Sequence, residues 1–108
     1  LIIPSDITEV KFASFRGCGS IKSVVFHDNV KTITRHSFNG CSSLTTVTIG
    51  SGVTSIGIQT FYNCANLTSV YCKPTTPPAG EKNMLAKSAS GCKIYVPRNS
   101  VDAYKSAS

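Results

Sequence analysis

The feature that most constrains this chain is a repeat with a period of 23 residues. When the sequence is shifted by that offset, one column contains only phenylalanine and another contains only cysteine. These columns are Phe15, Phe38 and Phe61, and Cys18, Cys41 and Cys64. Aliphatic columns repeat in the same way, among them Ile21, Leu44 and Leu67, Val24, Val47 and Val70, and Val10, Ile33 and Ile56. Self-similarity at this period indicates a solenoid, in which each coil buries its apolar face against its neighbours.

Turn-forming residues repeat in register with the core columns. Gly17, Gly40 and Asn63 each stand directly before a cysteine, and glycine and asparagine are the residues that tolerate a positive φ. A second set of turn formers consists of Asp6, Asn29 and Gly52. A repeat that keeps such residues in register repeats a backbone path as well as a composition.

Each period predicts a short series of elements. Residues 44–49, LTTVTI, are rich in β-formers and show the L-x-x-L-x-L spacing of a leucine-rich-repeat strand. Residues 53–56 predict a second extended segment, and residues 58–64 a helical or 3₁₀ turn. Stacking equivalent strands at ~4.8 Å produces parallel sheets. We therefore predict a β-rich, right-handed leucine-rich-repeat solenoid, and 108 residues allow about four to five coils of 23.

The repeat also predicts the core. The phenylalanine column should stack along the solenoid axis as a spine, with the cysteine and aliphatic columns beside it. The predicted core residues are Phe15, Phe38, Phe61, Cys18, Cys41, Cys64, Leu44, Leu67, Val47 and Val70.

The regular repeat ends after Cys72. The prolines between Pro74 and Pro78 exclude a helix or a central strand. Residues 83–89 predict a short helix that places Met84 in the phenylalanine column, and the strand returns at 93–96, slipped by one residue. Pro97 ends that strand, and Ser100 is the expected N-cap of a last short helix with Val101 and Tyr104 on one face.

These features predict one domain over residues 1–108. Residues 1–72 form its regular repeats, and residues 73–108 form an irregular last repeat and a C-terminal cap with a short helix. The chain opens on LIIP, which is already core material, so we expect sequence upstream of it. We also expect any signal or anchor region to lie outside this fragment.

Composition narrows the class of function. Charged residues make up 15% of the chain, below the usual ~25%, and serine and threonine fill the difference, which favours an extracellular setting. The net charge of +6 permits acidic partners, but the basic residues are scattered, so no nucleic acid is expected. Lys22, Lys31 and Arg35 are candidates for an electropositive edge. No apolar stretch approaches the ~20 residues of a transmembrane span.

The cysteines invite a chemical interpretation. Three equivalent cysteines in three coils, with His27 and His36 outside their column, do not indicate a nucleophile. A spacing of 23 also differs from the short Cys-x₂₋₄-Cys spacing of zinc sites. We therefore predict small buried side chains. A disulfide between Cys72 and Cys92 remains an alternative. The sequence predicts no enzyme, catalytic residue, metal or cofactor.

The outward positions of the strands are the candidate binding residues. One column runs from Val25 and Thr48 to Tyr71 and Tyr95, so it ends in two adjacent tyrosines. Tyrosine is common in binding surfaces. The candidate set is Tyr71, Tyr95, Thr46, Thr48, Ser69, Ser23 and Lys22. The alternative is cross-strand packing that only covers the sheet.

The repeat FNGCSSLTTVTIGSGVTSIG and the tail TTPP…KIYVPRNSVDAYKSA resemble the BspA-type leucine-rich repeat. Cys72, the pair Arg35 and His36, and Met84 depart from the family pattern. The resemblance implies a secreted or cell-surface protein of host-associated bacteria, and some relatives are adhesins that bind matrix proteins or other cells. No short ligand motif accompanies the repeat, so it names no ligand.

The main functional hypothesis is therefore a non-catalytic binding or adhesion module. It would engage a host or bacterial surface protein or a glycan through the exposed strand face. The alternatives are a structural spacer or stalk for another domain, and a binder of anionic polymer. A dimer through the exposed N-terminal coil is a further possibility.

Overall fold

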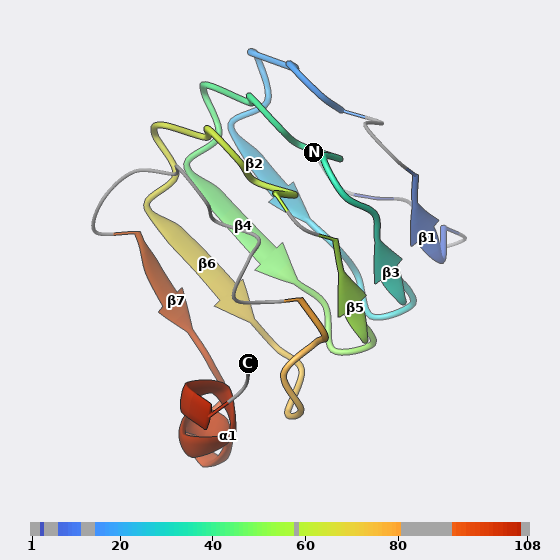
Figure 1. The fold of residues 1–108 in the computed structure, drawn as a ribbon, viewed down its shortest axis with the longest axis vertical. Coiled ribbons are helices and arrows are strands. Elements are labelled where there is room, and N and C mark those ends of the chain that lie inside the picture. The colour runs from blue at the N-terminus through green and yellow to red at the C-terminus, as the bar shows by residue number, and fades with distance from the viewer. Residues whose placement is uncertain (1–2, 4–6, 12–14, 58, 81–91, 107–108) are drawn as a thin grey trace.

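The computed structural model describes residues 3, 7–11, 15–57, 59–80 and 92–106, with side chains up to Tyr104 (Figure 1). Within this part of the chain, the strands form two parallel sheets. The four-stranded sheet consists of β2 (Ser23–Val25), β4 (Thr46–Ile49), β6 (Ser69–Cys72) and β7 (Lys93–Tyr95). The three-stranded sheet consists of β1 (Glu9–Val10), β3 (Thr32–Ile33) and β5 (Ser55–Ile56). From β1 to β6 the chain alternates between the sheets, and β7 then joins β6 in the four-stranded sheet. This path confirms the parallel solenoid with its 23-residue repeat.

The strand register follows the sequence columns. Val24 pairs with Val47, Val47 with Val70, and Val70 with Ile94. The first two steps are 23 residues, whereas the last is 24, because 94 − 70 = 24. The one-residue slip predicted for the last strand is therefore confirmed. Residue 3 continues the sheet beyond β2, where the Ile3 N–H donates to the Val25 carbonyl at 3.1 Å.

The predicted core columns belong to one buried cluster that also includes residues of both sheets. Eight of the ten predicted core residues are fully buried: Phe38, Phe61, Cys41, Cys64, Leu44, Leu67, Val47 and Val70. The other two, Phe15 and Cys18, are half-buried and pack against this cluster. Both belong to the first coil of the described residues, where the stack ends.

The phenylalanine spine is confirmed. Phe38 stacks on Phe15 with ring centroids 4.9 Å apart and on Phe61 at 5.7 Å, with interplanar angles of 9° and 22°. Phe26, which comes from the strand side of its coil, meets the Phe38 ring edge-on at 5.6 Å and 86°. The offset comparison did not predict this third contact, because Phe26 shares its column with Ile49 and Cys72.

Left-handed residues shape the turn opposite the sheets. Gly17, Gly40 and Asn63 have φ values of 71°, 77° and 59°, as their column predicted. His36 and Gln59, which are also 23 residues apart, have φ values of 60° and 56°. In the turn that contains Phe61, the Tyr62 backbone N–H donates a hydrogen bond to the Gln59 carbonyl at 3.1 Å. This turn does not continue as a helix because a left-handed residue lies at each end.

The second set of predicted turn formers, Asp6, Asn29 and Gly52, is not explained by positive φ where the structure describes it. Asn29 and Gly52 lie in turns but are not among the described residues with positive φ, and Asp6 lies outside the described residues. At Gly52, an added Cβ would lie 2.0 Å from the Asp28 carbonyl oxygen. Glycine is needed there because the preceding coil approaches closely.

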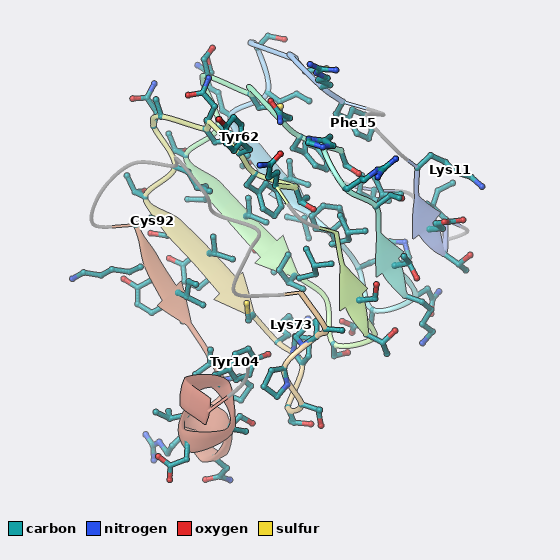
Figure 2. The ribbon with its side chains drawn as sticks, in the orientation of Figure 1. Lys11, Phe15, Tyr62, Lys73, Cys92 and Tyr104 are labelled. Atoms are coloured by element: carbon teal, nitrogen blue, oxygen red, sulfur yellow. The ribbon has the colours of Figure 1, made fainter. Side chains whose placement is uncertain are left out.

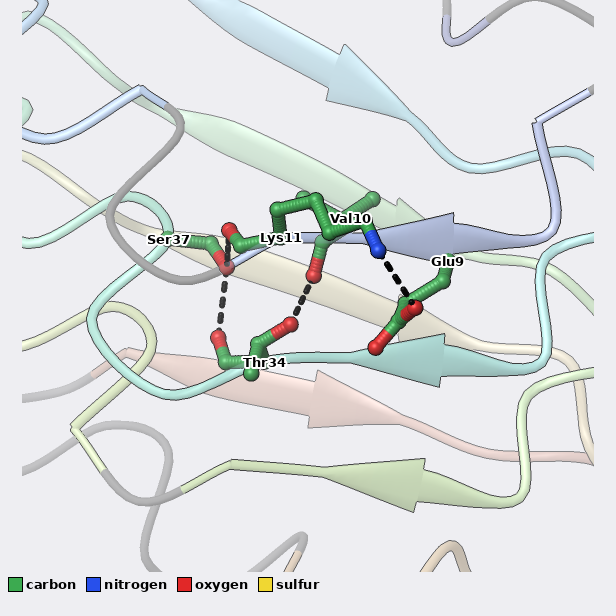
Figure 3. Close-up of polar contacts among 5 residues, drawn as sticks. All are labelled: Glu9, Val10, Lys11, Thr34 and Ser37. Carbon is green, nitrogen blue, oxygen red and sulfur yellow. Dashed lines mark hydrogen bonds and ion pairs between the residues drawn. The ribbon is translucent and has the colours of Figure 1, made fainter.

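Hydroxyl groups bond one coil to the next on the side of the three-stranded sheet (Figure 3). The buried Ser37 hydroxyl donates to the Lys11 carbonyl at 3.1 Å. The Thr34 hydroxyl donates to the Val10 carbonyl. These bonds satisfy backbone carbonyls where the strands end. The ion pair between Lys11 and Glu9 at 3.2 Å is exposed and joins two residues of the same coil, so it does not link neighbouring coils.

The C-terminal segment closes the last coil with a short helix, as predicted. A 3₁₀ helix at Arg98–Ser100 leads into α1 (Val101–Ser106). Tyr104 is buried, and its hydroxyl donates to the Pro74 carbonyl at 2.6 Å, which fastens α1 to the segment after β6 (Figure 2). Val101 does not share this contact, since its side chain stays 38% exposed. The helix predicted at 83–89 and Met84 lie outside the described residues.

Candidate binding face

The outward side of the four-stranded sheet holds most of the predicted binding residues. The strand register places them in two rows that cross the sheet. One row is Ser23, Thr46, Ser69 and Lys93, and the other is Val25, Thr48, Tyr71 and Tyr95. Side chains alternate along each strand, so both rows point away from the buried valine column. We call these eight residues the strand face.

The strand face is uneven. Tyr71 is 44% exposed, Tyr95 47% and Val25 37%, whereas the Thr46, Thr48 and Ser69 between them are half-buried. The short side chains therefore lie lower than the large ones on either side. The structure brings together six of the seven predicted site residues. Lys22 is exposed directly before β2, at the border of the face.

The two tyrosines stack on one another. Their ring centroids are 4.9 Å apart with an interplanar angle of 15°. That separation matches the ~4.8 Å between neighbouring strands, so the rings stack along the solenoid axis like the strands that carry them. Each ring limits the rotation of the other, which lowers the entropy that a ligand must remove on binding.

The hydroxyl groups on and beside the face differ in availability. The Thr45 and Thr68 hydroxyls each donate at 3.1 Å to a carbonyl of the preceding coil. Among the described residues, no hydrogen bond involves the hydroxyls of Thr46, Thr48 or Ser69. These three groups are therefore available to a ligand.

The predicted electropositive edge is not a single patch on the strand face. Lys22 precedes β2 of the four-stranded sheet, whereas Lys31 and Arg35 flank β3 of the other sheet. Lys73, which follows β6, forms an ion pair with Asp28 at 3.3 Å. Asp28 also accepts the Ser51 backbone N–H at 2.8 Å. Hydrogen bonds from the Ser51 backbone and side chain, followed by the one from Lys73, lower the pKa of the Asp28 carboxyl.

The cysteines are structural. All five are free thiols, so the disulfide considered between Cys72 and Cys92 is not formed. The Cys41 thiol donates to the Phe15 carbonyl at 3.2 Å, and the Cys64 thiol donates to the Phe38 carbonyl at 3.3 Å. Burial raises the pKa of both thiols, that of Cys64 to about 11. Both thiols are therefore buried, protonated hydrogen-bond donors at neutral pH, and burial in apolar surroundings lowers their reactivity.

Each of the two histidines contacts an asparagine within its own turn. His27 Nδ1 accepts the Asn29 backbone N–H at 3.0 Å, and His36 Nδ1 lies 3.0 Å from the Asn39 side-chain amide. Within the described ranges, no three histidine, cysteine or acidic side chains are grouped so that they could hold a metal ion. The same ranges contain no helix that is both long and apolar enough to cross a membrane.

A shallow recess lies outside the strand face. It has a volume of about 220 Å³ and lies between residues 51–54 and residues 74–77. The Thr54 hydroxyl at its border already donates to the Lys31 carbonyl at 3.2 Å. Its lining contains no charged side chain and no aromatic ring, so the strand face offers more contacts to a ligand.

The comparisons with known proteins agree with this architecture. The model of the BspA type leucine rich repeat region matches residues 1–105, with six copies of the repeat. The chain belongs to this family. The BspA-type repeat therefore accounts for almost the whole sequence. No curated protein sequence matches it.

A solved structure shows the same fold. The crystal structure of a leucine rich cell surface protein from Faecalibacterium prausnitzii A2-165 superposes with a TM-score of 0.60 at 20% sequence identity. The match covers 95% of this BspA-type chain and 34% of the Faecalibacterium chain. The present chain thus spans about a third of the length of that protein.

Two members of the face were not among the predicted site residues. Val25 and Lys93 complete the two rows, and both are exposed. Lys93 could have been predicted from the strand register, because the slip of one residue in the last strand aligns Lys93 with Ser69. The sequence also gave no sign that the tyrosine rings stack face to face.

Proposed function

We infer that this chain is a non-catalytic binding module that engages a protein or a glycan through the strand face. The observation that carries the proposal is the stacked pair Tyr71 and Tyr95. Two large aromatic side chains stand nearly half-exposed on a face whose neighbours are short hydroxyl residues. Aromatic side chains of this kind supply much of the energy at binding surfaces.

Rigidity supports the same role. Parallel pairing joins β2, β4, β6 and β7 beneath the face, and the two inner strands, β4 and β6, are paired on both sides. Below it lies a core whose central columns are fully buried. A ligand would therefore meet an already ordered surface, and little binding energy would be lost in ordering loops.

We place the parent protein outside the cell or on the cell surface of a bacterium. The structurally similar Faecalibacterium protein is a leucine rich cell surface protein, which supports this location. The low share of charged residues and the abundance of serine and threonine are consistent with it.

The test is a binding array that carries both matrix proteins and oligosaccharides. The chain is compared with the double variant Tyr71→Ala/Tyr95→Ala. A matched control is Tyr62→Ala, because Tyr62 is a half-buried tyrosine on the turn that faces away from the four-stranded sheet (Figure 2). The double variant should lose binding and the control should keep it. Equal binding by the chain and the double variant would refute the proposed face.

A salt titration separates this role from binding of an anionic polymer. Binding through released counterions weakens steeply as salt increases. Binding through stacked rings and hydroxyl groups should change little between low and moderate salt. A steep loss would favour the net charge of +6 as the cause and would count against the tyrosines.

A further inference from the structure

The free face of the Tyr71 ring forms one wall of a slot on the strand face. Because the rings stack, each covers one face of the other. Thr48 pairs with Tyr71 on the side away from Tyr95, so the remaining face of Tyr71 is directed toward the space above Thr48. A threonine side chain is much shorter than a tyrosine, and Thr48 is half-buried, so the outer part of that ring face is uncovered.

The slot has a second wall. Val25 pairs with Thr48 from the other side, and its side chain is 37% exposed. The order across the sheet is therefore Val25, Thr48, Tyr71, with a low floor between two raised walls. Two strand spacings separate the walls by about 9.6 Å. A group that touches both walls at carbon–carbon distances of 3.5–4.0 Å uses about 7–8 Å of this width, which leaves room for one ring.

The chemistry of the slot is neutral and mixed. Its walls are an aromatic face and two methyl groups, and its floor is the Thr48 hydroxyl. Thr46 and Ser69, in the neighbouring row, add two hydroxyl groups that make no hydrogen bond among the described residues. No charged side chain belongs to this set, and Lys93 lies at the far edge of its row. An ion placed here would lose hydration without meeting an opposite charge.

We propose that the slot binds a pyranose ring of a neutral, β-linked glycan. This inference rests on the proposed binding role of the strand face and names its ligand class. A β-linked glucose unit has an apolar C–H face that suits the Tyr71 ring and the Val25 methyls. Its hydroxyl groups around the ring edge suit Thr46, Thr48 and Ser69. The absence of charge in the slot matches the absence of charge in the ligand, and the rotational order of the stacked Tyr71 ring favours affinity.

The geometry assigns different roles to the two tyrosines. Tyr71 forms a wall of the slot, whereas Tyr95 lies behind it and contacts Tyr71 rather than the sugar. A protein ligand that covers the face would instead contact both ring edges and hydroxyls. The two kinds of ligand therefore respond differently to the same substitutions.

The experiment measures binding of a β-1,4-glucan hexamer by isothermal titration calorimetry, with an α-1,4-galacturonan hexamer as the anionic comparison. Thr48→Tyr fills the slot with a ring that the register would stack on Tyr71, and it leaves both native tyrosines in place. Tyr71→Ala should weaken binding about tenfold or more, from the loss of one stacking contact. Thr48→Tyr should abolish binding, and Tyr95→Ala should change it less than Tyr71→Ala. Circular dichroism and a urea midpoint confirm that each variant is folded.

Thr48→Val keeps the test informative if Thr48→Tyr does not fold. It has nearly the same shape and removes only the floor hydroxyl, so it should weaken glucan binding while the urea midpoint hardly changes. Undiminished glucan binding by Thr48→Tyr or Thr48→Val, or tighter binding of the galacturonan than of the glucan, would overturn the slot. If the glucan does not bind but a matrix protein binds and is lost with Tyr71→Ala/Tyr95→Ala, the slot is refuted while the proposed function stands.

Discussion

Replacing Phe38 by alanine tests how the coils are held together. The Phe38 side chain is fully buried and contacts three aromatic rings, with Phe15 and Phe61 stacked on its two faces and Phe26 at its edge. Deleting a buried phenylalanine costs about 3–5 kcal/mol, and each aromatic pair contributes about 0.5–1.5 kcal/mol beyond its buried area. Three such pairs place Phe38→Ala at the upper end, about 5 kcal/mol.

That loss is a large part of the total free energy of unfolding. Domains of this size are stable by about 5–15 kcal/mol, so the variant should be close to unfolding. With a urea m-value of about 2 kcal/mol/M, a loss of about 5 kcal/mol lowers the midpoint by about 2.5 M. Circular dichroism during urea titration provides the measurement.

Phe15→Ala is the matched control. Phe15 is half-buried and stacks on Phe38. Removing it deletes less buried area and fewer ring contacts, so its midpoint should fall by less than half as much. Equal shifts for the two variants, or an unchanged midpoint for Phe38→Ala, would refute the argument that the spine holds neighbouring coils together.

Three further predictions concern other parts of the fold. Gly57→Ala should destabilise the chain more than Gly40→Ala in the same urea assay. An added Cβ at Gly57 would lie 2.1 Å from a backbone nitrogen of the preceding coil. At Gly40 the nearest atom would be the Gly17 Cα at 4.0 Å, an ordinary contact, so only the ~1–2 kcal/mol strain of its φ of 77° remains. Tyr104→Phe should cost about 1–3 kcal/mol, because the Pro74 carbonyl at this buried bond loses its donor; an unchanged thermal midpoint would show that α1 is held by apolar contacts alone. Burial raises the pKa of Cys64 from 9.0 to about 11, so the unfolded thiol ionises first and the folded state loses stability as pH rises from 9 to 11. The variant Cys64→Ala should show a weaker decline in unfolding free energy over that range, and an identical decline would contradict a buried, protonated thiol.

The sequence predicted the path of the chain because the repeat compares the protein with itself. A column that keeps phenylalanine or valine through successive coils must occupy one environment, so burial and strand register follow directly. The predicted pairing of Tyr71 with Tyr95 depended on recognising the one-residue slip after Cys72, and the structure confirms it.

Features that do not repeat were harder to predict. Phe26 contacts Phe38 edge-on, but its column changes to Ile49 and Cys72, so no pattern marked it as aromatic. His36 and Gln59 share a column and both adopt positive φ, although glutamine, unlike histidine, is not enriched in the left-handed region. In both cases the surrounding coils determine the outcome, and single-residue preferences do not reveal it.

The candidate site was predicted as a set of residues but not as a shape. Alternation along the strands identified Thr46, Thr48 and Tyr71 as outward residues. It did not show that the tyrosine rings stand parallel at 4.9 Å, because this depends on side-chain rotamers and on two strands meeting in register. The slot above Thr48 follows from that stacking, so it emerged only with the structure.

Nuclear magnetic resonance can show which face of the solenoid contacts the ligand. A chain with labelled valine, isoleucine and threonine methyl groups would be titrated with the β-1,4-glucan hexamer or with the matrix protein that scores in the array. We expect shift changes at Val25, Thr46 and Thr48 on the four-stranded sheet, and none at Thr32 of β3. Changes centred on the three-stranded sheet, with Thr46 and Thr48 unaffected, would contradict this expectation.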